Sequence, residues 1–127
     1  MRAMLDTSVL IGTIPTAVID GIDEYGASFI VRAELLRGRE RFARTAGHEH
    51  AARVRTQLVE ALDAIPGFWT PFDDAAADAY ATLAARPETA VRSKDALIAA
   101  QAVARGVPLL TADRGFTRFI GLDVEFI

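Results

Sequence analysis

The stretch Arg2-Ala3-Met4-Leu5-Asp6-Thr7-Ser8-Val9-Leu10-Ile11 begins with an apolar run that ends at a carboxylate. This pattern predicts a strand over Arg2–Leu5, a polar helix cap at Thr7–Ser8 and a short helix after it. Asp6 therefore stands where core-forming sequence ends. An ionised acid buried alone in such a place costs several kcal/mol, so it must face solvent, pair with a cation or join a metal site.

Three more acids stand in similar places along the chain. Glu34 comes shortly after the apolar run Phe29–Val31, Asp95 opens an alanine-rich helical segment, and Asp113 follows Leu109–Leu110. Four acids that border core-forming sequence favour a shared metal site over four separate surface charges.

Short strands alternate with helical segments along the rest of the chain. Apolar, β-branched or aromatic runs predict further strands at Ser28–Val31, Phe68–Phe72, Leu109–Thr111 and Val124–Ile127. Helical spacing of apolar residues predicts helices at Ala17–Tyr25, Arg32–Thr45, His48–Ile65 and Ala75–Ala85, and from Asp95 to Gly106. Residues Arg86–Lys94 are expected to form a surface loop. This alternation predicts an α/β fold, with a mainly parallel sheet of about five strands and helices on both faces.

The composition is that of one soluble globular domain spanning residues 1–127. The chain has 127 residues, 51% hydrophobic and 24% charged, and no cysteine. Its apolar runs are far shorter than the ~20 residues of a membrane span. The N-terminus lacks the long apolar run of a signal peptide, so we expect a cytoplasmic protein without a membrane partner.

The charge is unevenly distributed although the net charge is only −3. The segment from Arg32 to Arg55 contains seven of the fourteen basic residues and three acids, so its net charge is +4. The rest of the chain contains seven basic residues and fourteen acids, so its net charge is −7. A basic segment beside an acidic site suits a protein that handles a polyanion through metal ions. The alternative is a solvated helix surface with ordinary charge pairs.

The predicted fold brings the acids toward one edge of the sheet. Asp6 and Asp113 follow strands, and ligand sites of parallel sheets form beyond the carboxyl ends of the strands. Glu34 and Asp95 are expected in the first turn of helices, where the helix dipole favours a negative charge. Carboxylates gathered there repel one another unless a divalent cation joins them, and oxygen ligands suit Mg²⁺ or Mn²⁺. Such ions support phosphodiester hydrolysis.

Four sequence motifs follow one another along the chain: Met4-Leu5-Asp6-Thr7-Ser8-Val9-Leu10-Ile11, Arg32-Ala33-Glu34-Leu35-Leu36-Arg37-Gly38, Lys94-Asp95-Ala96-Leu97-Ile98-Ala99-Ala100 and Leu110-Thr111-Ala112-Asp113-Arg114-Gly115-Phe116. In this order they resemble the motifs of a PIN-domain ribonuclease, and more narrowly of a VapC-type toxin from a toxin–antitoxin pair. The resemblance covers nearly the whole chain. It implies a metal-dependent endoribonuclease that is inhibited by a cognate antitoxin, forms homodimers and cleaves structured RNA.

The resemblance also assigns residue roles. It implies that the metal-binding and catalytic quartet is Asp6, Glu34, Asp95 and Asp113, with Mg²⁺ or Mn²⁺ as the cofactor. Ser8 and Thr111 match small hydroxyl positions that support this site by hydrogen bonds. An antitoxin segment is expected in a groove between the apolar faces of Ala17–Tyr25 and Arg32–Thr45.

Each of these residues also has an ordinary structural interpretation. Asp6 and Asp95 are alternatively helix caps, Glu34 a first-turn charge and Asp113 a turn former; Ser8 is alternatively a cap and Thr111 a strand residue. The whole chain is alternatively a PIN-like module that binds RNA or protein without cutting. His48 and His50 are two residues apart, do not share a helix face and are expected at a solvated helix start.

Overall fold

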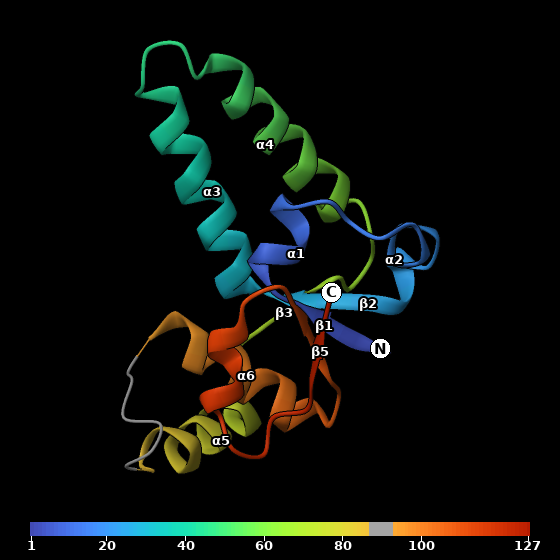
Figure 1. The fold of residues 1–127 in the computed structure, drawn as a ribbon, viewed down its shortest axis with the longest axis vertical. Helices are drawn as coiled ribbons and strands as arrows, with labels where there is room; N and C mark the ends of the chain where they lie inside the picture. The colour runs from blue at the N-terminus through green and yellow to red at the C-terminus, as the bar shows by residue number, and fades with distance from the viewer. Residues whose placement is uncertain (87–92) are drawn as a thin grey trace.

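A five-stranded parallel sheet forms the centre of the computed structural model, which describes residues 1–86 and 93–127 (Figure 1). The strands lie in the order β3-β2-β1-β4-β5. Their bounds are β1 (Ala3–Leu5), β2 (Tyr25–Ser28), β3 (Trp69–Thr70), β4 (Leu109–Thr111) and β5 (Val124–Phe126). The predicted α/β fold with a five-stranded sheet is confirmed. Most of the loop expected at Arg86–Lys94 lies outside the described residues.

Strand β1 is the middle strand, with β2 on one side and β4 on the other. Ala3 pairs with Tyr25 of β2, and Met4 pairs with Leu109 of β4. All three residues of β1 are buried, as expected for a parallel strand that is covered on both faces. Because β1 and β4 are parallel neighbours, the residues that follow them emerge side by side at one edge of the sheet.

Helices cover both faces of this sheet (Figure 1). In the described residues they are α1 (Thr7–Ile11), α2 (Thr16–Asp20), α3 (Phe29–Ala43), α4 (Glu49–Asp63), α5 (Asp74–Ala84) and α6 (Lys94–Arg105), with 3₁₀ helices η1 (Ile22–Glu24) and η2 (Arg114–Arg118). Helices α1, α3 and α4 lie above the sheet in Figure 1, and α5 and α6 lie below it. None of the helices formed by residues 1–86 and 93–127 combines the length and the apolar character needed to cross a membrane.

The second strand lies earlier in the sequence than predicted. The strand was expected at Ser28–Val31, but β2 spans Tyr25–Ser28, and helix α3 already begins at Phe29. Ser28 ends the strand because its hydroxyl accepts a hydrogen bond from the Ile30 N–H at 2.9 Å and caps the helix. Tyr25 belongs to β2, so the single helix predicted over Ala17–Tyr25 is also wrong: it breaks at Gly21 into α2 and η1.

The third strand is shorter than predicted. Of the expected strand Phe68–Phe72, only Trp69–Thr70 pairs with β2. Beyond these residues, the side-chain amide of Gln101 donates to the Thr70 and Pro71 carbonyls, both at 3.0 Å. Pro71 has no N–H to donate to a further bond between strands, and the carbonyls of Thr70 and Pro71 accept hydrogen bonds from Gln101 instead.

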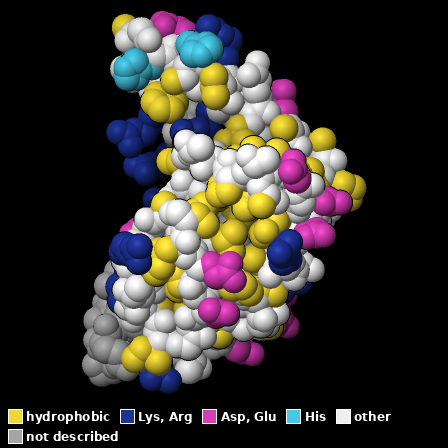
Figure 2. Space-filling model, turned by 45° about the vertical axis from the view of Figure 1, so that its right-hand side comes forward, with side chains coloured by type: hydrophobic (Ala, Val, Ile, Leu, Met, Phe, Trp, Pro, Cys, Tyr) yellow, Lys and Arg dark blue, Asp and Glu magenta, His cyan; other side chains and the backbone are white. Residues whose placement is uncertain are grey.

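Helices α3 and α4 form an antiparallel arm, residues 29–63, that projects from the sheet (Figure 1). Only residues near its base are buried, namely Val31, Leu35, Val59 and Leu62. The basic segment predicted between Arg32 and Arg55 lies on this arm. Figure 2 shows Lys and Arg side chains along one side of the arm and both histidines at its tip.

An ion pair closes the base of the arm. Arg32 of α3 donates from Nε and Nη2 to the two carboxylate oxygens of Asp63 at 3.0 and 2.9 Å, and Trp69 Nε1 donates to Asp63 Oδ1 at 2.7 Å. The Arg32 hydrogen bond, followed by that of Trp69 and the charge of Arg32, lowers the pKa of Asp63, while its partial burial opposes this. A carboxyl group whose pKa is lower in the folded chain stabilises the fold above its unfolded pKa, and this stabilisation disappears as the pH falls through the folded value.

Replacing Asp63 with asparagine is therefore expected to destabilise the fold in a pH-dependent way. We expect a loss of about 0.5–1 kcal/mol at pH 7, a small value because solvent screens this pair, whose side chains are 31% and 38% exposed. The loss should shrink below about pH 4, where the unfolded carboxyl group is protonated. Urea unfolding at several pH values measures it, with the exposed Asp20→Asn as control. A loss of equal size at pH 7 and pH 2.5 would contradict the ion-pair origin.

Candidate metal centre at the carboxyl edge of the sheet

Asp6 lies between β1 and α1 and is only 5% exposed. Its main-chain N–H donates to the Leu110 carbonyl at 3.0 Å, which fixes it beside the end of β4. Its Oδ2 accepts two hydroxyl hydrogen bonds, from Ser8 at 2.8 Å and from Thr111 at 2.9 Å. Asp6 occupies the N-cap position of α1 but makes no side-chain cap bond, and Thr7–Ser8, the predicted cap, lies inside the helix. Asp6 Oδ1 accepts no hydrogen bond from the described residues.

Ser8 and Thr111 tie helix α1 to the loop that follows β4. Their hydroxyl oxygens are 3.2 Å apart, and each also accepts a main-chain N–H, Ser8 from Ala112 and Thr111 from Asp113, both at 3.0 Å. Thr111 is fully buried. The two hydroxyls therefore hold one oxygen of Asp6 and the backbone of Asp113 in a single network.

Asp113 and Gly115 form a tight turn at the start of η2. Asp113 Oδ1 accepts the Gly115 N–H at 2.8 Å. A Cβ atom at position 115 would lie 3.0 Å from Asp113 Oδ1 and 2.9 Å from Arg118 Nη1, so only glycine fits without a shift of these side chains. Asp113 is a turn former, as its structural interpretation proposed, and its main-chain N–H also connects it to the Asp6 network through Thr111.

Glu34 reaches the same region from helix α3. Its Oε1 accepts the hydroxyl of Thr7 at 3.1 Å, and its Oε2 pairs with Lys94 Nζ at 3.3 Å. Thr7 follows Asp6 directly, so this bond places Glu34 beside it. Because α3 begins at Phe29, Glu34 lies in the second turn and not, as predicted, in the first. Glu34 therefore lies beyond the first turn, where the field of the helix dipole is strongest.

Asp95 lies in the first turn of α6, as predicted. The cap of this helix is Ser93, whose hydroxyl accepts the Ala96 N–H, so the interpretation of Asp95 as the cap is wrong. Asp95 Oδ2 is instead 3.3 Å from Arg118 Nη2. Arg118 also donates from Nη1 to the Gly115 carbonyl, which connects Asp95 to the turn that carries Asp113.

The donor chemistry of this edge fits a hard divalent cation. Carboxylate oxygens are the ligands that Mg²⁺ and Mn²⁺ prefer, and Asp6 offers an oxygen without a protein partner in the described chain. The side chains do not surround one point: among residues 1–86 and 93–127, no group of three or more Asp, Glu or His residues is arranged to hold a metal. Two of the four acids are paired with Lys94 and Arg118 instead.

Comparison with known families identifies the family to which this fold belongs. The family model of the PIN domain matches residues 3–122. The chain belongs to the PIN-domain family. The resemblance inferred from the four sequence motifs is confirmed at this level. Comparison with curated protein sequences gives no match.

Solved structures similar to this PIN domain come from toxin–antitoxin complexes. A chain of VapBC-5 from Mycobacterium tuberculosis is 30% identical, with a TM-score of 0.76 and coverage of 99% of this chain and 97% of that one. A chain of DNA-bound VapBC from Salmonella typhimurium is 24% identical, with a TM-score of 0.75 and coverage of 99% and 98%. VapBC2 from Rickettsia felis, bound to a promoter DNA fragment, contains a chain 20% identical, with a TM-score of 0.74 and coverage of 100% and 99%. The last two show likeness of fold alone.

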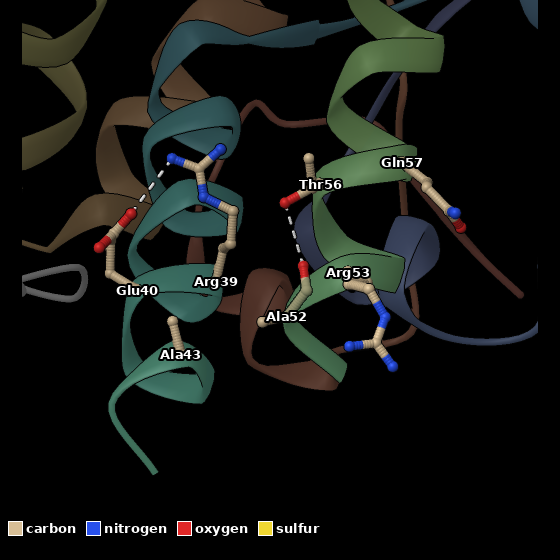
Figure 3. Close-up of a pocket in the computed structure, with 7 residues that line it drawn as sticks. All are labelled: Arg39, Glu40, Ala43, Ala52, Arg53, Thr56 and Gln57. Atoms are coloured by element: carbon tan, nitrogen blue, oxygen red, sulfur yellow. Dashed lines mark hydrogen bonds and ion pairs between the residues drawn. The ribbon is translucent and has the colours of Figure 1, made fainter. Parts of the chain in front are cut away.

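A second hollow region of the PIN domain lies apart from the four acids. A hollow of about 370 Å³ lies between α3 and α4 on the arm, lined by Arg39, Glu40, Ala43, Ala52, Arg53, Thr56 and Gln57. Figure 3 shows Arg39 paired with Glu40, while Arg53 and Gln57 point away from α3. None of the four acids lines this hollow. His48 is the residue before α4 and packs edge-on against Phe42 at 5.8 Å, which agrees with an exposed helix start.

Sequence reasoning missed three residues of the site: Thr7, Lys94 and Arg118. Thr7 follows Asp6 and Lys94 precedes Asp95 within the motifs given above, so both could have been predicted as neighbours of the site from their positions next to these acids. Arg118 carries no such signal, because its approach to Asp95 depends on the path of η2.

Replacing Thr111 with valine is expected to destabilise this PIN domain although the shape is nearly conserved. The valine would leave the Asp113 N–H without its acceptor and Asp6 Oδ2 with one donor fewer. An unsatisfied buried polar group costs about 1–3 kcal/mol. Urea unfolding measures the change, with Thr111→Ser as the control that keeps the hydroxyl. Equal stability of the valine and serine variants would rule out the hydroxyl network as the cause.

Proposed function

We propose that this PIN domain is a metal-dependent endoribonuclease that hydrolyses RNA phosphodiester bonds, acting as the toxin of a type II toxin–antitoxin pair. The observation that carries the proposal is Asp6, a carboxylate 5% exposed with one oxygen unused and no basic partner in the described chain. A buried, unpaired carboxylate is costly, so its presence calls for a cation that is supplied from outside.

Asp6, Glu34, Asp95 and Asp113 are the proposed ligands, with Mg²⁺ or Mn²⁺ as the cofactor. When bound, the ion would supply positive charge that lowers the pKa of a water molecule and stabilises charge developing on the phosphodiester. The support for this set is that hydrogen bonds and ion pairs connect all four acids at one edge of the sheet.

The surrounding side chains are proposed to keep the ligands in place. Ser8 and Thr111 both donate to Oδ2 of Asp6, which leaves Oδ1 free to bind the proposed cation. Their shared hydrogen bonds to the backbone of residues 112 and 113 limit movement of the loop that carries Asp113. Ligands held in this way lose less freedom when the cation binds.

RNA is the proposed substrate, and the basic arm is its proposed support. The segment from Arg32 to Arg55 carries the excess of arginine, whereas the remaining chain is acidic. Arginines on an exposed arm can bind phosphates and add a salt-dependent attraction for RNA. An RNA substrate also agrees with the expected cytoplasmic location.

An antitoxin and a second copy of the chain are the proposed partners. The similar solved structures are described as VapBC complexes. Here an apolar hollow of about 410 Å³ lies between α1, α3 and α4, with Ile11 and Val54 about half exposed. An antitoxin helix or extended segment would cover such a surface. The groove predicted beside Ala17–Tyr25 is different, because no residue of that segment lines this hollow.

A second candidate function is a PIN-like module that binds RNA or protein without cutting. One observation favours it: Glu34 and Asp95 are already neutralised by Lys94 and Arg118, and no three acids in the described chain surround a common point. The two functions differ in whether RNA is hydrolysed.

The test is to incubate the purified chain with total RNA in Mg²⁺, in Mn²⁺ and in EDTA, and to map the new 5′ ends. The proposed function predicts discrete ends that appear only with a divalent ion. Intact RNA under all three conditions, together with retained RNA binding, would favour the non-cutting module. Ends that are equally abundant in EDTA would exclude the metal mechanism.

A further inference from the structure

Two basic side chains of the PIN domain pair with carboxylates of the proposed metal site. A divalent cation would otherwise neutralise the negative charges of these carboxylates. Lys94 Nζ is 3.3 Å from Glu34 Oε2, and Arg118 Nη2 is 3.3 Å from Asp95 Oδ2. Both carboxylates are partly buried, with side-chain exposures of 22% and 32%. Four acids and two bases leave an excess of two negative charges at this edge of the sheet.

Arg118 is placed among the acids by the turn around Gly115. Its Nη1 donates to the Gly115 carbonyl, and a Cβ atom added at Gly115 would meet both Arg118 Nη1, at 2.9 Å, and Asp113 Oδ1, at 3.0 Å. Arg118 therefore lies close to Asp113 as well as to Asp95. A cation at this position competes with a metal ion for the same carboxylates.

The contacts of Arg118 are incomplete. Its Nε is buried without a hydrogen-bond partner in the described chain, and only one of its terminal nitrogens contacts Asp95. Its guanidinium stacks at 4.3 Å from the centre of the Phe119 ring. A bidentate arginine pair is stronger than this single contact, so Arg118 can be displaced from Asp95 at modest cost.

We propose that Arg118 and Lys94 act as built-in counterions, which hold Asp95 and Glu34 apart from the other acids until a divalent cation displaces them. They therefore lower the affinity of the PIN domain for its metal. This inference rests on the metal-dependent function proposed above. It accounts for the absence of a gathered three-acid group among residues 1–86 and 93–127.

The proposal predicts that removing either positive charge strengthens metal binding. Arg118→Gln is expected to bind Mn²⁺ about fivefold more tightly than the unaltered chain, since the ion no longer has to break the pair with Asp95. Lys94→Gln should change the affinity in the same direction, and it serves as the second variant because Lys94 is largely exposed. Calorimetric titration of the RNA-free protein with Mn²⁺ measures both affinities.

Arg105→Gln is the matched control. It also removes one positive charge from helix α6, but Arg105 pairs with Asp73, at 3.9 Å, and with none of the four acids. Arg105 lies ten residues after Asp95 and therefore about 15 Å from it along the helix. At physiological ionic strength this distance exceeds the screening length of about 8 Å, so its effect should stay below about twofold.

The outcomes separate this inference from the proposed function. Mn²⁺ binding that is unchanged or weaker in Arg118→Gln and in Lys94→Gln overturns the counterion role, even if the enzyme is metal-dependent. Unchanged binding with slower RNA cleavage in Arg118→Gln would assign Arg118 to the RNA and also overturn it. If no protein binds Mn²⁺, the metal-dependent function itself fails, and this inference fails with it.

Discussion

Replacing Asp6 with asparagine is expected to reduce RNA cleavage by at least about a hundredfold while the fold is retained. The change removes the negative charge of the one buried acid that has no basic partner in the described chain. Asparagine is close in shape, and its carbonyl oxygen can accept the Ser8 and Thr111 hydroxyls as Oδ2 does. Loss of like-charge repulsion should leave the thermal stability equal or slightly higher.

Two measurements check this expectation together. Cleavage of RNA is followed under single-turnover conditions, and thermal unfolding is followed with and without millimolar Mn²⁺. The unaltered chain should melt at a higher temperature with Mn²⁺, because the ion binds the native state, whereas the Asp6→Asn variant should show a smaller shift or none. Full cleavage by the variant would refute the assignment of Asp6.

Asp73→Asn is the matched control for this substitution. Asp73 caps helix α5 by accepting the Ala76 N–H at 3.0 Å, and asparagine caps helices about as well as aspartate. The same chemical change far from the proposed site should therefore leave cleavage and stability nearly unaltered. A large loss of cleavage in this control would mean that general charge, rather than the site, governs activity.

Replacing Phe116 with alanine is expected to produce the largest loss of stability, about 3–5 kcal/mol. Phe116 is fully buried, belongs to η2 and packs against Phe119 with ring centres 5.8 Å apart. Its removal leaves a cavity under the turn that carries Asp113. A single domain has a total stability of about 5–15 kcal/mol, so a large share would be lost.

Urea unfolding measures this loss, and Phe72→Ala is the comparison. Phe72 is 37% exposed and makes an edge-on contact with Tyr80, so the same truncation there should cost about 1 kcal/mol or less. Equal losses for the two phenylalanines would contradict the assignment of Phe116 to the core beneath the site.

The sequence was informative where local rules decide the structure. The apolar run before Asp6 and the run Leu109–Thr111 became neighbouring parallel strands, and Gly106 ends α6 in the left-handed conformation with φ of 65°. The strand Tyr25–Ser28 was not predicted, because its sequence, Tyr-Gly-Ala-Ser, contains no β-branched residue that would favour a strand. Gly26 is suited to the place because a Cβ would lie 3.0 Å from the Phe68 carbonyl, a contact between residues far apart in sequence.

The sequence alone therefore determined the α/β class, the family motifs and the four candidate acids, since these depend on residue type and short-range pattern. Tertiary structure decided how each acid is held. It gave Asp6 two hydroxyl donors and no basic partner in the described residues, and gave Glu34 and Asp95 one cation each, Lys94 and Arg118. These pairs join residues 60 and 23 positions apart, so only the packing of α3, α6 and η2 brings their charges within reach.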